Sequence, residues 1–507
     1  MKTIRPRSLS SPETDTSVPD ASMNGAGIVS PPPVLPDGDS FSANGHDSPQ
    51  PDEDLAGIFL SETADDDGNA KCAYAMFGRE FLYCEAYGWM CWTGTHWQAD
   101  EGEARIDRAL FAMLKQRRLI AVGAGKEAVV KFCAGTAKRV RDCKMAFRSL
   151  ITVSVDEFDQ CTDELNVANG ILNLRTGELL PHDSQRRFTY CSRVPYVPDA
   201  DDSTWRAFLA SAVDGGENVI DYLQMVVGYS LTGHTSEECL WYIYGPSRSG
   251  KGIFTEVLLA ILGSPLSIEV DFATFTAKRE GDTQNFDLAP LKPTRLVITS
   301  ESNRYEVLNA GKIKQLTGGN HIRAAYKHRD LFTYRPQFKA WLVSNQPVNA
   351  DVDDDALWYR VKVVEFPNGH AGNEDKMLKQ RMKSPETLAG VLRWAVEGAR
   401  RWYASGAIGL EHPSAVKLAT RTHRAELDYV QAWLDERCDE AGGAWTANSA
   451  LYASYENWCR ANGVTPKAIR GLSMALKAKG FAVGEQRWID GQNGKGVAGI
   501  SLKLGKN

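Results

Sequence analysis

Several classes of protein are excluded by what this 507-residue sequence lacks. Its ten cysteines are scattered, with no C-x-x-C pair and no cysteine–histidine cluster at zinc spacing, so neither a disulfide scaffold nor a structural zinc site is expected. No apolar run approaches the roughly 20 residues that a membrane span needs, and no signal-peptide pattern opens the sequence. We therefore expect a protein of a reduced cytoplasm with no membrane partner, in which Cys84 and Cys91 are buried thiols.

Positive charge is also scarce, but only in one part of the chain. The net charge is −6, and residues 1–67 contain three basic and thirteen acidic residues, a net of −10 that leaves +4 on the remainder. Residues 1–55 are rich in Pro, Ser, Asp and Gly and cannot bury enough apolar surface to offset chain entropy. We predict a disordered acidic tail over 1–67, with no room for a polymerase or primase domain, ahead of a body that can bind nucleic acid locally.

The most informative stretch of the body is a glycine-rich loop. Residues 240–244 form an apolar run typical of a buried strand, and a helical pattern begins near Lys251. Between them lies G-P-S-R-S-G-K, the G-x-x-x-x-G-K spacing of a loop whose backbone N–H groups converge on a polyphosphate. The following helix directs its positive end at the same anion, and Lys251 adds a mobile charge. We therefore predict ATP binding by Gly245, Pro246, Ser247, Arg248, Ser249, Gly250, Lys251, Gly252 and Ile253.

The loop departs from the usual pattern at Gly252. Such loops usually carry a Ser or Thr after the lysine, and its hydroxyl holds Mg²⁺. Ser249, Thr255 or a water molecule could replace that hydroxyl, and the sequence leaves all three open.

Three polar residues follow in an order that suits ATP hydrolysis. Glu301 ends the β-rich run 295–300, where it would lie beside the γ-phosphate, polarise water and support Mg²⁺. Asn345 ends the run 338–344 and could orient the attacking water. Arg360 precedes the strand-like run 361–366 and could reach the ATP of a neighbouring subunit, or else form a salt bridge with Asp353 to Asp355.

A basic hairpin is predicted between Glu301 and Asn345. Two short β-like runs flank Tyr326, Lys327, His328 and Arg329. Three cationic or titratable side chains and one aromatic ring at a hairpin tip suit the phosphates and bases of single-stranded DNA. The alternative is an ordinary solvent-exposed turn.

Two further patterns lie near the ends of the body. Trp89, Trp92 and Trp97 alternate with glycines and predict a β-hairpin, with a core role or, alternatively, base stacking. A basic helical stretch follows over 105–144, as a solvated face or a phosphate-tracking surface.

At the carboxyl end, three helical patterns precede two β-like runs joined by a glycine-rich tip, which is typical of a winged helix. Its candidate DNA contacts are Lys467, Arg470, Lys477 and Lys479 at the third helix and Lys495 on the wing, with protein docking as the alternative.

Taken together, these motifs resemble the phage/plasmid primase-helicase family, whose motor belongs to the superfamily 3 helicases. The resemblance covers residues from about 70 to the end, and it rests on N-G-I-L-N-L-R-T-G-E-L at 169–179, G-Y-S-L-T-G at 228–233, K-Q-L-T-G-G at 314–319, S-N-Q-P at 344–347 and W-Y-R-V at 358–361. It implies a homohexameric ring with ATP at subunit interfaces, where Lys251, Glu301 and Asn345 face Arg360 of the neighbour. It also implies that Lys327 and His328 track DNA.

The sequence therefore predicts an α/β fold: a P-loop ATPase core with a mixed α+β amino-terminal domain and a carboxy-terminal winged helix. The expected domains are a tail (1–67), an amino-terminal domain (68–204), an ATPase domain (205–405) and a winged helix (406–507). We expect an ATP-dependent DNA helicase that uses Mg²⁺ and single-stranded or forked DNA to replicate a phage, prophage or plasmid in the cytoplasm of a bacterial host.

Primer synthesis would fall to a host or phage primase. The alternatives are an ATP-gated replication initiator that does not unwind DNA, and a small-molecule kinase.

Overall fold

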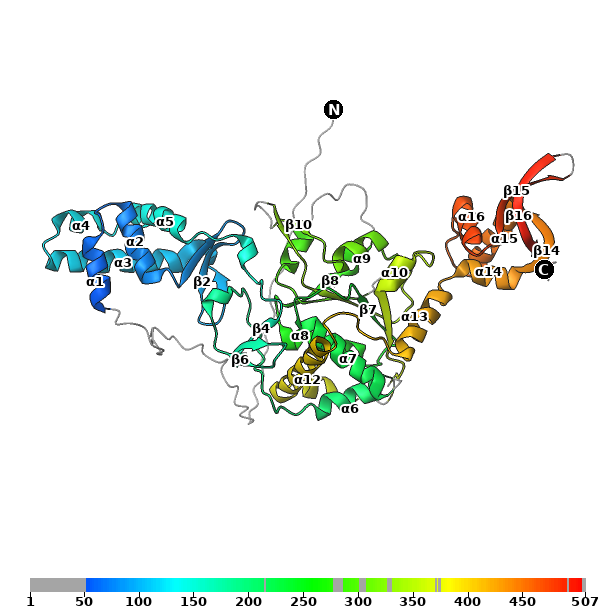
Figure 1. Cartoon of the computed structure of the whole chain (residues 1–507), viewed down its shortest axis with the longest axis horizontal. Helices are drawn as coiled ribbons and strands as arrows, with labels where there is room; N and C mark the ends of the chain where they lie inside the picture. Colours follow the sequence, from blue (N-terminus) through cyan, green and yellow to red (C-terminus); the bar gives the residue numbers. More distant parts are fainter. Residues whose placement is uncertain are drawn as a thin grey trace, which may run out of the picture. The chain divides into compact units, whose positions relative to one another are not determined.

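Five parallel strands form the central sheet in the computed structural model, which describes residues 52–213, 216–276, 286–300, 307–325, 331–369, 372, 375–489 and 492–503. Their order is β13 (Val361–Glu365), β7 (Leu240–Tyr244), β12 (Lys339–Ser344), β9 (Leu296–Ser300) and β8 (Ser267–Asp271). Helices cover both faces of this sheet (Figure 1), which explains why β7, β9 and β12 are continuous apolar runs. The predicted α/β core and these predicted strands are confirmed.

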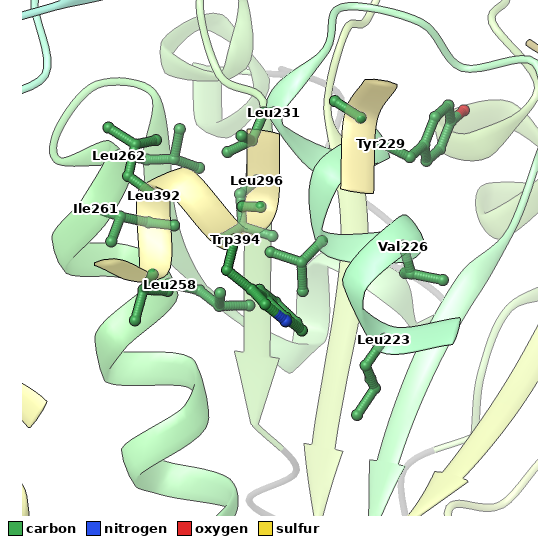
Figure 2. Close-up of a cluster of buried hydrophobic side chains, with 14 of the residues drawn as sticks. Leu223, Val226, Tyr229, Leu231, Leu258, Ile261, Leu262, Leu296, Leu392 and Trp394 are labelled. Atoms are coloured by element: carbon green, nitrogen blue, oxygen red, sulfur yellow. The ribbon is translucent and has the colours of Figure 1, made fainter. Parts of the chain in front are cut away.

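Alternate residues of β7, β9, β12 and β13 enter two separate cores. Trp241, Ile298 and Trp341 pack on one face of the sheet, in a hydrophobic cluster of which Figure 2 shows several leucines, Trp394 and Tyr229. The helices on this face come both before and after the glycine-rich loop in the sequence. Those helices are α6 (Ser203–Ala212), α7 (Glu217–Leu231), α8 (Lys251–Leu262) and α12 (Pro385–Ala404). The opposite face is covered by α9 (Ala310–Thr317), α10 (Asp355–Arg360) and α13 (Ser414–Glu426). The alternation follows the two-residue period of a strand.

Helix α13 belongs to this sheet, although the sequence analysis places it in the 406–507 domain. The Thr420 hydroxyl accepts a hydrogen bond from the Val363 amide at 3.0 Å, which satisfies a donor on the edge strand β13. The His423 ring packs 4.9 Å from that of Tyr242. The next hydrophobic core begins only at Val430. Because only a few residues of α13 are apolar and buried, its sequence pattern does not predict this packing.

The amino-terminal region packs helices on a small antiparallel sheet. Its elements are α1 (Asp52–Ser61), α2 (Asp66–Phe77), β1 (Phe81–Cys84), β2 (Gly88–Trp92), β3 (Trp97–Ala99), α3 (Ala104–Gly123), α4 (Glu127–Phe132) and α5 (Ala137–Ile151). Strands β2 and β3 pair with Trp92 opposite Trp97, as predicted, and Trp89 and Trp97 are buried, which confirms their core role. Cys84 and Cys91 are also buried, and all ten cysteines are free.

Part of the predicted tail is folded. Helix α1 starts at Asp52, inside the segment 1–67, and its Phe59 is fully buried. The buried guanidinium of Arg117 donates to the carbonyl oxygens of Phe59, Glu62 and Thr63 at 3.1, 2.8 and 2.9 Å. Arg117 thus satisfies carbonyls at the end of α1 rather than facing solvent with the other basic residues of 105–144. Residues 1–51 lie outside the described residues.

Three short strands connect this region to the central sheet. They are β4 (Glu164–Val167), β5 (Gly170–Asn173) and β6 (Leu179–Leu180), paired antiparallel in that order. Buried residues of β4 and β5, such as Val167 and Ile171, join the same core as Trp241. The predicted 68–204 domain therefore contributes to three hydrophobic cores among the described residues, one of which it shares with the central sheet.

The carboxy-terminal region contains the predicted helices and hairpin and one additional strand. The elements are α14 (Tyr429–Arg437), β14 (Cys438–Ala447), α15 (Asn448–Ala461), α16 (Ile469–Ala478), β15 (Ala482–Ile489) and β16 (Gln492–Leu502). Strand β14 pairs with β16, and its polar, glycine-containing sequence lacks the alternation that would predict a strand. Among the described residues, no helix has the length and apolar content that a bilayer crossing requires.

Candidate nucleotide site

The glycine loop has the strand–loop–helix context that its spacing predicts. Strand β7 ends at Tyr244 and α8 begins at Lys251, so the loop comprises residues 245–250. A Cβ atom at Gly245 would lie 2.1 Å from the Phe366 carbonyl oxygen, so only glycine permits this approach. Gly250 has a φ of 92°, in the left-handed region that favours glycine, and a Cβ there would lie 3.0 Å from the Phe208 ring.

Lys251 is folded back onto the loop. Its ammonium donates to the carbonyl oxygens of Gly245 and Pro246 at 2.8 and 2.6 Å, and to the Ser249 hydroxyl at 3.2 Å. Burial lowers the pKa of Lys251 to about 8. The lysine charge is therefore held beside the loop by neutral oxygens that a phosphate could replace.

The loop opens onto a cavity of about 1290 Å³ at the carboxyl edge of the sheet. Register explains which residues meet there, because Tyr244 pairs with Ser344 and Ser300 pairs with Val343. The lining includes Asn345 and Ser300 together with residues 248–253, so most of the predicted loop and the predicted Asn345 border one space. Glu301 follows Ser300 directly and lies outside the described residues.

Two walls of the cavity have no counterpart in the sequence analysis. Helix α6 contributes Ala207 and Phe208, and helix α11 (Leu378–Met382) contributes Leu378 and Met382. Glu256 of α8 ties α11 to the loop helix by ion pairs with Lys379 at 2.8 Å and Lys383 at 2.6 Å. An apolar wall beside an anion-binding loop is suited to a nucleobase. Neither helix carries a local motif, because only the fold brings them to the loop.

The structure distinguishes the two hydroxyls that could replace the missing one after Lys251. Ser249 lines the cavity. The Thr255 hydroxyl donates to the carbonyl oxygens of Lys251 and Gly252, both at 3.2 Å, within α8. In the described part of the chain, no group of three His, Cys, Asp or Glu side chains is arranged to hold a metal ion. Of Ser249 and Thr255, Ser249 is the one that lines the cavity.

Arg360 lies at the opposite, amino edge of the sheet. It ends α10 just before Val361, which pairs with Leu240 at the start of β7. Its guanidinium forms an ion pair with Glu238 at 2.6 Å. The aspartates considered as its partners bind other cations, Asp354 with Lys314 at 3.2 Å and Asp355 with Arg424 at 2.6 Å.

The predicted DNA-binding residues fall on two elements. Strands β10 (Ile322–Ala324) and β11 (Phe332–Tyr334) pair antiparallel as the hairpin requires, while Tyr326, Lys327, His328 and Arg329 lie outside the described residues. Arg470 and Lys477 are exposed on α16. Lys467 precedes α16 and pairs with Asp353 at 3.0 Å.

Comparisons with known proteins identify two regions of the chain. Residues 70–214 match the family described as D5 N terminal like, and residues 243–360 match a family of unknown function, DUF5906. The second region contains the loop from Ile243 onward, Asn345 and Arg360.

Two viral proteins are similar over part of their length. "Putative helicase L207/L206" of Acanthamoeba polyphaga mimivirus is 25% identical over 317 residues, which is 58% of this chain and 32% of that protein. "Putative helicase 022R" of Frog virus 3 (isolate Goorha) is 22% identical over 287 residues, 53% of this chain and 29% of that protein. The chain thus spans about a third of the length of these curated relatives.

Among solved structures, the A form apo structure of the NrS-1 C terminal region has a TM-score of 0.45 and 12% identity, over 84% of this chain and 98% of that chain.

A D5 N terminal like region followed by a DUF5906 region is the architecture of the primase-helicase family that the sequence motifs resemble. The chain thus has the domain architecture of the primase-helicase family.

Proposed function

We propose that the chain is an ATP-dependent DNA helicase that assembles into a ring and hydrolyses ATP between subunits, in the replication of a phage, prophage or plasmid. The cavity at the carboxyl edge of the sheet carries this proposal. It joins the glycine loop, Asn345 and the end of β9 in about 1290 Å³, which is room for a nucleoside triphosphate. Similarity to two viral proteins named as helicases supports DNA unwinding as the work that hydrolysis drives.

ATP would bind with its phosphates on the loop and its base against α6 and α11. Lys251 would exchange its bonds to the Gly245 and Pro246 carbonyls for bonds to phosphate oxygens. Asn345, on the same cavity, would orient the attacking water, and Glu301 would polarise it. Each role suits the position at which the corresponding strand ends.

The donor groups also suit Mg²⁺, which neutralises phosphate charge when it binds with ATP. Ser249 and Glu301 would hold the ion, because Ser249 lines the cavity and its hydroxyl accepts a hydrogen bond from Lys251, whereas the Thr255 hydroxyl is bonded within its helix. Hydroxyl and carboxylate oxygens are the ligands that Mg²⁺ prefers.

Arg360 supports a shared site and therefore a ring. It stands at the amino edge of its own sheet, a strand length from the loop, so it would act on the ATP of a neighbouring subunit. Six subunits in a closed ring would give each ATP one such arginine, and each Glu238–Arg360 pair would open as the ring forms.

DNA would be held at two places. The β10–β11 hairpin would present Tyr326, Lys327, His328 and Arg329 to the strand that passes along the ring. The carboxy-terminal region, as a winged helix, would contact DNA through Arg470 and Lys477, and through Lys467 once its pair with Asp353 opens.

The shared site is tested by mixing two inactive variants. Arg360→Ala should bind ATP without turnover, and Glu301→Gln should do the same. Rings assembled from both variants should regain part of the ATPase rate, because some interfaces then contain an intact Arg360 and an intact Glu301. Arg400→Ala is the matched control, since Arg400 is also ion-paired, to Glu397 at 2.9 Å, and should leave the rate unchanged. Mixed rings that stay inactive contradict the proposal.

Strand displacement on forked DNA separates the helicase from its alternatives. The intact chain should unwind the fork with ATP, while the Lys327→Ala, His328→Ala double variant should hydrolyse ATP without unwinding. DNA binding and hydrolysis without any displacement by the intact chain would favour a replication initiator. Phosphate transfer to a metabolite, without stimulation by DNA, would favour a kinase.

A further inference from the structure

Beyond Val483 and Val497, the β15–β16 hairpin has one face of exposed side chains. Register places four of these side chains on the same face because opposite residues of paired strands share a side of the sheet. They are Gln486 opposite Lys495 and Trp488 opposite Asn493. All four are exposed, and Trp488, at 75%, is the most exposed large apolar side chain among the described residues.

The other face of the hairpin is covered by Trp445 of β14. A Cβ atom at Gly496 would lie 2.4 Å from the indole, and one at Gly494 would lie 3.4 Å from it. The indole N–H also donates to the Glu485 carbonyl oxygen at 3.3 Å. The glycines of this hairpin are therefore needed for Trp445 to pack, and this packing braces the hairpin from behind.

A bulge directs the open face away from the core of the carboxy-terminal region. The register shifts between Val483 and Glu485, at Gly484, whose φ is 90°. Val483, before the bulge, packs on the core that contains Val497, whereas the residues after the bulge are exposed. A bulge bends a strand and re-aims the side chains beyond it. Trp488 is thus held out on a braced hairpin instead of folding inward.

We propose that this face binds single-stranded nucleic acid, with an unpaired base stacked on Trp488 and a backbone phosphate on Lys495. The exposed indole of Trp488 offers a flat surface on which any base can stack. Lys495 lies on the same face, two residues along β16 from the residue opposite Trp488, so its ammonium can reach the adjoining phosphate. Gln486 and Asn493, joined by a hydrogen bond of 3.2 Å, add amide groups that can bond to base edges.

Charge favours nucleic acid over other partners for this face. Among the described residues of the hairpin, its only acidic side chain, Glu485, points to the covered side, next to Arg487 at 3.8 Å. Within the described part of the hairpin, the open face thus carries the positive charge of Lys495 and no acidic side chain. This inference rests on the proposed function, because it needs DNA to be the substrate, and it adds a contact beyond Lys467, Arg470 and Lys477.

The test compares ordinary and abasic single-stranded oligonucleotides of equal length, bound to the full chain and followed by fluorescence anisotropy. Trp488→Ala should weaken binding to the ordinary oligonucleotide about tenfold and binding to the abasic one hardly at all. Trp488→Phe should restore most of the lost affinity. Lys495→Ala should weaken both equally and reduce the salt dependence by about one ion. Tyr74→Ala, which removes an exposed aromatic ring elsewhere, should change neither.

The possible outcomes separate this inference from the proposed function. If the intact chain binds no DNA, the proposed function fails. If the intact chain binds DNA and Trp488→Ala binds it equally well, or loses the same factor on ordinary and abasic strands, the stacking inference is overturned. A thermal unfolding midpoint unchanged in Trp488→Ala is expected, since an indole 75% exposed contributes little packing.

Discussion

Two buried lysines at opposite edges of the central sheet have similar partners and different surroundings. Lys251 follows the carboxyl end of β7 and donates to two loop carbonyls and a hydroxyl. Lys339 begins β12 at the amino edge and donates to the carbonyl oxygens of Thr232, His234 and Gln337. Burial lowers the pKa of both. A buried lysine with a lowered pKa is therefore not, by itself, the mark of a functional site.

The difference lies in what borders each ammonium. Lys251 lines a cavity of about 1290 Å³, so water or phosphate can take over its partners. Lys251 and Lys339 are similarly buried, at 5% and 3% exposed, but the three carbonyls that bind Lys339 come from the end of α7 and the approach to β12, which it ties together. Hydrogen bonds from a lysine to carbonyl oxygens can thus be exchanged for bonds to phosphate at the carboxyl edge, whereas at the amino edge they join two segments of the chain.

Removing the lysine at the open edge should have the largest effect on function. Lys251→Ala should weaken ATP binding at least about a hundredfold, because two or more charge-assisted hydrogen bonds to phosphate are lost. The free energy of unfolding should hardly change, since water can reach the freed loop carbonyls. Isothermal titration and denaturant unfolding of the same preparation measure both. A loss of stability as large as that of the Lys339 variant would contradict the distinction.

Removing Lys339 at the amino edge should reduce the stability of the fold instead. Lys339→Met should lower the free energy of unfolding by about 3 kcal/mol, because three carbonyl oxygens around a nearly buried side chain lose their donor. ATP affinity should stay within about twofold at temperatures where the variant is folded. Lys251→Ala is the matched control. Normal stability together with weak ATP binding in Lys339→Met would reverse the assignment of the two edges.

The sequence predicts the interactions at the carboxyl edge of the sheet far better than those at the amino edge. The G-x-x-x-x-G-K spacing predicts the loop between β7 and α8 because its glycines and lysine are consecutive. Lys339 and Arg295 read as ordinary charges at the starts of strands, yet Arg295 donates to the carbonyls of Cys161 and Thr162 at 2.9 and 3.1 Å. Those partners are distant in sequence and are backbone groups, so no residue pattern identifies them.

The same limit explains the other differences between the predictions and the structure. Helix α1 is held by Arg117, and α13 by the edge of β13, both through backbone groups. The α6 and α11 walls of the cavity depend on packing between segments far apart in the chain. Strand endings, by contrast, place Asn345 correctly beside the loop because parallel strands end at one edge.

Protonation of Lys251 should make ATP affinity depend on pH. Its pKa is about 8 in the free protein, and bound phosphate would raise that pKa, so binding above pH 8 must take up a proton. Affinity should be nearly constant from pH 6.5 to 7.5, as far as Lys251 is concerned, and then fall up to about tenfold per pH unit above 8. Titrations in buffers of different ionisation enthalpy should show proton uptake.

A guanidinium that stays charged is the control for this dependence. Lys251→Arg should bind ATP more weakly than the lysine but with no loss between pH 8 and 9.5, because the arginine does not titrate there. A decline of equal slope in both proteins would mean that another group controls the pH dependence.

The smallest expected effect compares two glycines, one at each edge. A Cβ at Gly252 meets no atom within 4 Å, whereas one at Gly233 would lie 2.3 Å from a guanidinium nitrogen of Arg295. Gly252→Thr should therefore fold normally and raise Mg²⁺ affinity in the presence of ADP several-fold, because it adds the hydroxyl that such loops usually carry. Gly252→Ala adds the Cβ without the hydroxyl and should show no such gain.

Gly233→Ala should instead destabilise the chain, since its Cβ would lie 2.3 to 2.9 Å from atoms of Arg295, Gln337 and Thr162. If Gly252→Thr binds Mg²⁺ no better than Gly252→Ala, the Ser249 hydroxyl already fills the position that Gly252 leaves open. Comparing Gly252→Thr with Gly252→Ala thus tests the metal ligand. Comparing substitution of Gly252 with substitution of Gly233 tests whether a side chain is tolerated better at the carboxyl edge of the sheet than at the amino edge.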